Sequence, residues 1–97
     1  MQHICFLINF LYSLNSTILD EVEMENNQLE KYYQQCGRNI RYYRQQKKMS
    51  QAVLGGKANL EKSAVQLLER GSSPTLKTLI MVAHALEVPA AALLQFD

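Results

Sequence analysis

The chain has 97 residues, of which 47% are hydrophobic and 20% are charged. This length and composition are typical of one soluble globular domain, and they argue against a multi-domain enzyme, a dinucleotide-binding fold or a TIM barrel. The two cysteines, Cys5 and Cys36, have neither metal-binding spacing nor the density of a disulfide framework. A reducing cytosol fits this cysteine usage.

The net charge of +1 is unevenly distributed along the chain. Residues 1–30 contain five acidic and no basic residues, which gives −5. Residues 31–97 contain all ten Lys and Arg residues and four acidic residues, which gives +6. A basic domain of this kind indicates a polyanionic partner, of which nucleic acid is the commonest.

Residues 1–27 are expected to form an N-terminal extension, and residues 28–97 the domain itself. An apolar run from Ile4 to Tyr12 stands out in the extension. The run is too short to span a bilayer and lacks the basic start and cleavage site of a signal peptide. Several interpretations stay open. One interpretation is that the extension is disordered, and another is that it packs on the domain or on a partner chain. A third is that it touches a membrane, and a fourth is that it precedes a natural start at Met24.

From Gln28 onward, apolar residues recur at three- and four-residue steps, which is typical of amphipathic helices. A first helix is expected from Gln28 to about Lys48. Gly37 within it indicates either close helix packing or a weak point. The inward stripe of this helix consists of Leu29, Tyr32, Tyr33, Cys36, Ile40, Tyr43 and Lys47.

Three short helices are then expected, each with its own start or stop signal. Ser50 is a suitable N-cap for a helix from Gln51 to about Lys57, and Asn59 suits the tight turn after it. A helix from about Lys62 to Glu69 turns Val65 and Leu68 inward, and Gly71 is a natural stop. Thr75 caps a fourth helix, whose apolar repeat consists of Leu76, Leu79, Ile80, Ala83 and Leu86.

A last short helix from Ala90 to Leu94 follows Pro89, which favours a helix start. Five helices with a short pair in the middle are the layout of a compact helix-turn-helix domain. Five segments in order make the pattern specific: 37–41 with Arg44, 49–54, 65–71, 73–79 and 83–88. Together they resemble the Xre/Cro/C1 family of helix-turn-helix transcriptional regulators, which includes phage repressors, restriction–modification controllers and many antitoxins. The resemblance covers about residues 36–94 and implies an all-α, five-helix, lambda-repressor-like fold.

The resemblance also implies which residues read DNA bases. In the family the recognition helix lies in the major groove, and its outward positions match Lys62, Ser63, Gln66 and Leu67 here. Helical spacing agrees, because with Val65 and Leu68 in the core these four side chains point away from it. Lys can donate to guanine, Gln can pair with adenine, Ser serves base or phosphate, and Leu can meet a thymine methyl. Leu67, and Glu61 at the N-cap, depart from the commoner family residues.

Other positions match the family's DNA-backbone contacts and one structural ion pair. The phosphate-side candidates are Gln51, at a helix N-terminus that suits phosphate, and Lys77, with Arg70 and Arg38 as weaker candidates. Arg44 and Glu69 match an ion pair that orients one helix on another. No catalytic arrangement, phosphate-binding glycine loop or metal-ligand spacing is present, so we expect no enzyme activity, cofactor or metal.

These features predict a cytoplasmic bacterial or phage regulator that binds double-stranded DNA, most simply as an autoregulating repressor. One short helix reads too few base pairs to be selective, so we expect a homodimer on a two-fold operator with half-sites about 10 bp apart. The expected dimer surface consists of Val88, Leu93, Leu94 and Phe96. The alternative is a protein-interaction module, such as an antitoxin, that docks a toxin through residues 1–30.

Overall fold

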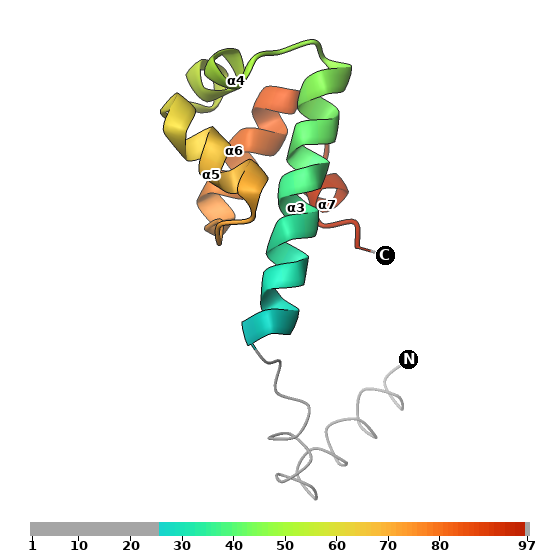
Figure 1. Cartoon of the computed structure of the whole chain (residues 1–97). Helices are drawn as coiled ribbons and strands as arrows, with labels where there is room; N and C mark the ends of the chain where they lie inside the picture. Colours follow the sequence, from blue (N-terminus) through green and yellow to red (C-terminus); the bar gives the residue numbers. More distant parts are fainter. Residues whose placement is uncertain (1–25, 97) are drawn as a thin grey trace, which may run out of the picture.

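The computed structural model describes residues 26–96, and it contains no strand within them. Figure 1 shows the helices, which are α3 (Asn26–Gln46), α4 (Gln51–Ala58), α5 (Lys62–Arg70), α6 (Leu76–Leu86) and α7 (Ala90–Leu93). This architecture confirms the all-α, five-helix prediction. The apolar run from Ile4 to Tyr12 lies outside the described residues.

The long helix α3 organises the fold. It packs against α5 on one side and α7 on the other, while α4 packs on both α5 and α6. In Figure 1 the first turns of α3 extend beyond the rest of the domain. Asn39, in the middle of α3, donates hydrogen bonds to the carbonyl oxygens of Leu93 and Gln95, both at 3.0 Å. These two bonds hold the end of the described chain against α3.

Side-chain caps start two helices where the sequence predicted them. The Ser50 hydroxyl accepts from the Val53 amide at 3.0 Å, and the Thr75 hydroxyl accepts from the Thr78 amide at 3.1 Å. Each bond satisfies an amide that has no partner within its own helix. Glu61 occupies the N-cap position of α5 but makes no capping hydrogen bond through its side chain.

Helices α3 to α6 end in the same way. A left-handed residue follows each helix, and the next amide bonds to the carbonyl five residues back. This pattern is the Schellman motif, which satisfies carbonyls left over at a helix end. Asn59 and Gly71 suit the left-handed conformation, as predicted, whereas Lys48 and Glu87 do not. Met49 follows Lys48 and Val88 follows Glu87, and both pack against the core, which helps to hold these two turns.

The core lies where the helices meet. Its fully buried side chains include Ile40 from α3, Leu54 from α4, Val65 from α5 and Leu86 from α6. Leu93 of α7 is also completely buried. These residues come from every described helix, so one shared core holds the fold together.

The expected inward stripe of α6 is wrong at two positions. Leu76 is 69% exposed and Ile80 is 52% exposed, while Val82 and Ala85 are buried beside Leu79, Ala83 and Leu86. Apolar residues occupy almost the whole of α6, so spacing alone allowed two overlapping stripes. The contacts of α6 with α4 and α7 decide which stripe is buried.

Gly37 lies where α3 approaches α5 closely. Of its two predicted roles, close helix packing or a weak point, the structure supports close packing. A Cβ atom there would lie 2.4 Å from the carbonyl oxygen of Leu68 and 2.8 Å from that of Glu69. Only a residue without a side chain allows α3 and the end of α5 to approach so closely. This contact brings Arg44, two turns further along α3, toward the end of α5.

Candidate nucleic-acid interface

The outer face of α5 exposes the four residues predicted to read bases. Lys62, Ser63 and Leu67 are exposed and Gln66 is half-buried, while Val65 and Leu68 face the core. Leu67 is 55% exposed and therefore does not pack inward. A short helix with one buried edge and a polar outer face is the form that enters a major groove.

A hydrogen-bonded network fixes α5 relative to the rest of the domain. Arg44 of α3 donates from Nε to Glu69 Oε2 at 2.6 Å and from Nη2 to Glu69 Oε1 at 3.0 Å. Its Nη1 donates to the carbonyl oxygen of Met49 at 2.9 Å. Two parallel bonds between a guanidinium and a carboxylate define both distance and orientation. The structure therefore brings together the ion pair that the family resemblance implied.

The ion pair is largely shielded from solvent. The Arg44 side chain is 12% exposed and that of Glu69 is 5% exposed. The hydrogen bond to Glu69 raises the pKa of Arg44, against the smaller opposing effect of burial. Among the described residues, no buried side-chain nitrogen or oxygen is without a hydrogen-bond partner. The network is thus a satisfied polar cluster rather than a strained one.

Gln51 joins this network in a way that the sequence did not indicate. Its Nε2 donates to Glu69 Oε1 at 3.2 Å, so the first residue of α4 is linked to the last turn of α5. Sequence spacing carries no signal for this bond, because the two residues belong to different helices. Gln51 still lies at the start of α4, where the helix amides favour an anion.

The remaining phosphate-side candidates lie in different environments. Lys77 is exposed in the first turn of α6, and Arg70 is exposed at the end of α5. Arg38 is exposed on α3, and its Nε and Nη2 donate to Gln35 Oε1 at 3.3 and 3.0 Å. Arg41 shares the helix face of Gly37 and Arg44, which is the face toward α5. Arg41 is exposed on this face and is therefore a further candidate for a phosphate contact.

The predicted dimer residues are split between core and surface. Leu93 is completely buried within the chain and Val88 is half-buried. Leu94 and Phe96 are 43% and 37% exposed, and the Phe96 ring meets that of Tyr32 edge-on at 5.0 Å. Leu93 therefore belongs to the core, and its exposed neighbours remain the candidates for a dimer surface.

Other kinds of site find no support in the part of the chain that the structure describes. No group of three His, Cys, Asp or Glu residues within residues 26–96 could hold a metal ion. None of the described helices is long and apolar enough to cross a membrane.

The comparisons with known proteins identify this arrangement. The helix-turn-helix family model HTH_3, of the Xre/Cro/C1 type, matches residues 40–93, which is more than half of the chain. The chain belongs to the Xre/Cro/C1-type helix-turn-helix family. The restriction-modification controller protein C.AhdI from Aeromonas hydrophila is similar in structure, with a TM-score of 0.60 and 30% sequence identity over 61% of this chain and 91% of that one. No curated protein matches the chain.

Membership of the Xre/Cro/C1-type family makes the chain a DNA-binding transcriptional regulator. The family match covers α4 and α5, the two helices that form the helix-turn-helix, together with the core residues beneath them. The match begins at Ile40, so the first turns of α3 lie outside it.

Proposed function

We propose that the protein is a sequence-specific repressor that regulates its own gene by binding a two-fold operator as a homodimer. The outward face of α5 carries this proposal. Lys62, Ser63 and Gln66 offer hydrogen bonds to base edges, and Leu67 offers an apolar contact to a thymine methyl. Gln51, Lys77 and Arg70 would hold the DNA backbone. Arg41 and Arg38 of α3 are further candidates for phosphate contacts.

Exposed apolar residues support the homodimer. Leu76 and Ile80 lie one turn apart on the outer side of α6, and both are more than half exposed. Leu94, Phe96 and the half-buried Val88 follow in or beside α7. A monomer of this size has no need for so many exposed apolar side chains on its last two helices, and a second copy would remove them from water.

A DNA-binding titration tests the specificity. The DNA immediately upstream of the protein's own gene is compared with a scrambled sequence at low and at physiological salt. A preference of about 10³ or more that survives physiological salt indicates operator recognition. Weak and equal binding to both DNAs that is lost with salt would contradict the proposal and favour the antitoxin alternative. That alternative depends on residues 1–30, most of which lie outside the described residues.

Two variants connect the binding to the structure. A Lys62→Ala, Gln66→Ala double variant is expected to stay folded and to lose the preference for the operator, because both substitutions are on the outer face of α5.

An Ile80→Lys variant is expected to sediment as a monomer, because a charge replaces an exposed apolar residue of α6. Val53→Lys serves as the matched control for sedimentation, since Val53 is similarly exposed but lies on α4. If Ile80→Lys still sediments as a dimer, α6 does not form the dimer surface.

A further inference from the structure

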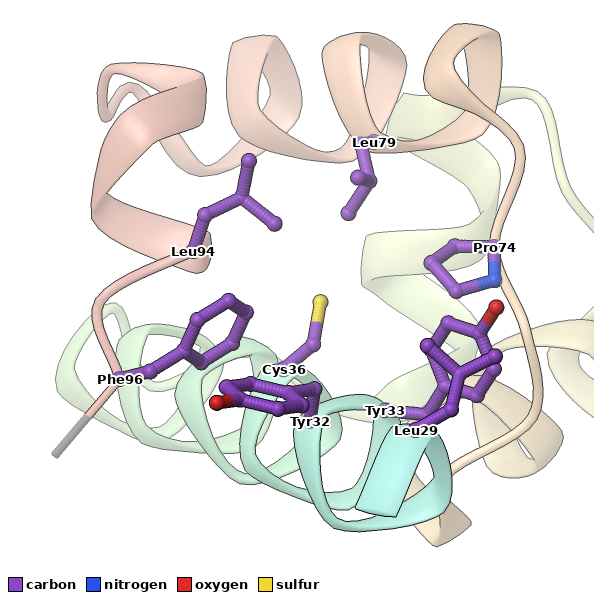
Figure 2. A pocket seen from close by; sticks show the side chains of 8 residues that line it. All are labelled: Leu29, Tyr32, Tyr33, Cys36, Pro74, Leu79, Leu94 and Phe96. Atoms are coloured by element: carbon purple, nitrogen blue, oxygen red, sulfur yellow. The ribbon is translucent and has the colours of Figure 1, made fainter. Parts of the chain in front are cut away.

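An apolar hollow lies beside the N-terminal half of α3 and takes no part in the proposed DNA interface. It has a volume of about 400 Å³. Figure 2 shows side chains converging on it from α3, from the loop before α6, from α6 and from the chain after α7. The lining residues are Leu29, Tyr32, Tyr33, Cys36, Pro74, Leu79, Leu94 and Phe96.

The hollow exists because α3 has more apolar surface than the other described helices cover. Residues 29, 32, 33 and 36 form one stripe at helical spacing, and α3 runs further toward its N-terminus than its partners extend (Figure 1). Leu79 and Phe96 also line the hollow, and although the Phe96 ring contacts that of Tyr32, Tyr32 remains 40% exposed. Burying such aromatic and aliphatic surface is favourable in proportion to its area, so a suitable apolar partner would bind there.

We propose that residues 4–12 of the same chain occupy this hollow. The run Ile4–Tyr12 contains eight apolar residues out of nine, and no Asp, Glu, Lys or Arg precedes Asp20. The run can therefore enter an apolar site without burying a charge, which would be costly. The acidic residues begin after it, in the connecting stretch that leads to α3.

The connecting stretch is long enough to reach. Residues 13–25 separate the run from α3, and thirteen extended residues span up to about 45 Å. The hollow lies within about 15 Å of the start of α3, because Cys36 is ten residues along a helix that rises about 1.5 Å per residue. A short covalent connection also gives the run an effective concentration on the order of millimolar at the hollow.

This inference does not rest on DNA binding, and it can be tested separately from the homodimer. Leu94 and Phe96 border the hollow and are also candidates for the dimer surface, but Leu29 and Tyr33 line only the hollow, and Leu76 and Ile80 belong only to the dimer proposal. A variant at Leu29 therefore tests the hollow, whereas Ile80→Lys tests the dimer.

Nuclear Overhauser contacts in the full chain provide the test. We expect contacts from the methyl groups of Ile4, Leu7, Ile8 or Leu11 to the rings of Tyr33 and Phe96. In a sample that mixes isotope-labelled and unlabelled chains, these contacts should remain within one chain. Contacts that pass only between chains would overturn the proposal in favour of a second copy's segment, and no contact at all would exclude any role of the run in the hollow.

Two variants make the test specific. Phe6→Asp with Phe10→Asp should abolish the contacts and lower the thermal midpoint, while the amide spectrum of α4 and α5, which contribute no lining residue, stays unchanged. Leu29→Lys should abolish the same contacts from the other side, and Val53→Lys should preserve them. If the contacts persist in both the Phe6/Phe10 and the Leu29 variants, the run does not bind through its apolar side chains and the proposal is wrong.

Discussion

Arg44 Nε lies 2.6 Å from Glu69 Oε2, and through this ion pair the last turn of α3 is tied to the last turn of α5. Glu69→Leu would leave the guanidinium without its carboxylate in a position where it is only 12% exposed. We expect a loss of about 3–5 kcal/mol in the free energy of unfolding, measured by urea denaturation. Gln51→Ala, which removes only the 3.2 Å bond to Glu69, should cost about 1 kcal/mol.

The double variant Arg44→Met, Glu69→Leu measures how strongly the stabilising effects of the two residues depend on each other. Because it leaves no unpaired charge, it should be more stable than the sum of the single losses indicates. If the losses measured for Arg44→Met alone and for Glu69→Leu alone add up to the loss of the double variant, Arg44 and Glu69 do not stabilise the domain as a pair.

Two glycines give opposite predictions for the same substitution. Gly37→Ala should destabilise the domain by about 1–3 kcal/mol, because its Cβ would meet the carbonyl oxygens of Leu68 and Glu69 at 2.4 and 2.8 Å. Gly56→Ala should stabilise it by about 0.5–1 kcal/mol, because alanine is the better helix former and the new Cβ would meet no atom within 4 Å apart from the backbone of its own helix and its chain neighbours. Thermal unfolding of both variants checks this pair. A loss of stability in Gly56→Ala would mean that α4 is not helical at that position.

Lys48 occupies a left-handed turn with φ of 57°, which a side chain makes unfavourable. Lys48→Gly should therefore raise the free energy of unfolding by roughly 1 kcal/mol, since the turn and its two backbone bonds would remain. Asn59→Gly is the control, because Asn already tolerates this conformation, and a smaller gain is expected there. An equal or larger gain at Asn59 would contradict this explanation.

Local signals in the sequence were sufficient to predict the helices, the starts of α4 and α6, and the ends of α4 and α5. Ser50, Thr75, Asn59 and Gly71 act within a few residues of themselves, so their roles could be read from the sequence alone. The burial of Val65 and Leu68 likewise followed from the 3.6-residue period, and with it the outward direction of the α5 face.

Features that depend on contacts between helices were not predictable in the same way. Leu76 and Ile80 were expected to be inward because α6 is apolar almost all round, and only its contacts with α4 and α7 select Val82 and Ala85 instead. The burial of Leu93 and the bond from Gln51 to Glu69 also arise from tertiary packing. The Arg44–Glu69 pair was anticipated from the family resemblance and not from spacing.

Burial raises the pKa of the Cys36 thiol, and we therefore expect the stability of the domain to fall at alkaline pH. Below pH 9.0 the thiol is neutral in both the folded and the unfolded chain, and its contribution to stability is fully present. Above that pH the unfolded thiol ionises first, so stability falls as pH rises toward the folded pKa, by at most about 1.4 kcal/mol per pH unit. Cys36→Ala should unfold more easily at neutral pH, with a difference from wild type that shrinks above pH 9.0. A difference that stays constant with pH would exclude this effect.

Substitutions of base-reading residues should change how DNA affinity depends on sequence, whereas substitutions of phosphate-binding residues should change how it depends on salt. Gln66→Ala should weaken binding to the operator by about 1–3 kcal/mol and relax the preference at one base pair, because it would remove the proposed bidentate contact to a base. Lys77→Ala should weaken binding to all sequences alike and reduce the slope of log K against log salt by about 1, because it would remove one proposed phosphate contact. Lys31→Ala is the matched control, since Lys31 is also exposed but lies in the first turns of α3, outside the family match. A salt slope that changes as much in Lys31→Ala as in Lys77→Ala would mean that the basic charge acts at a distance and that the start of α6 does not contact the DNA backbone.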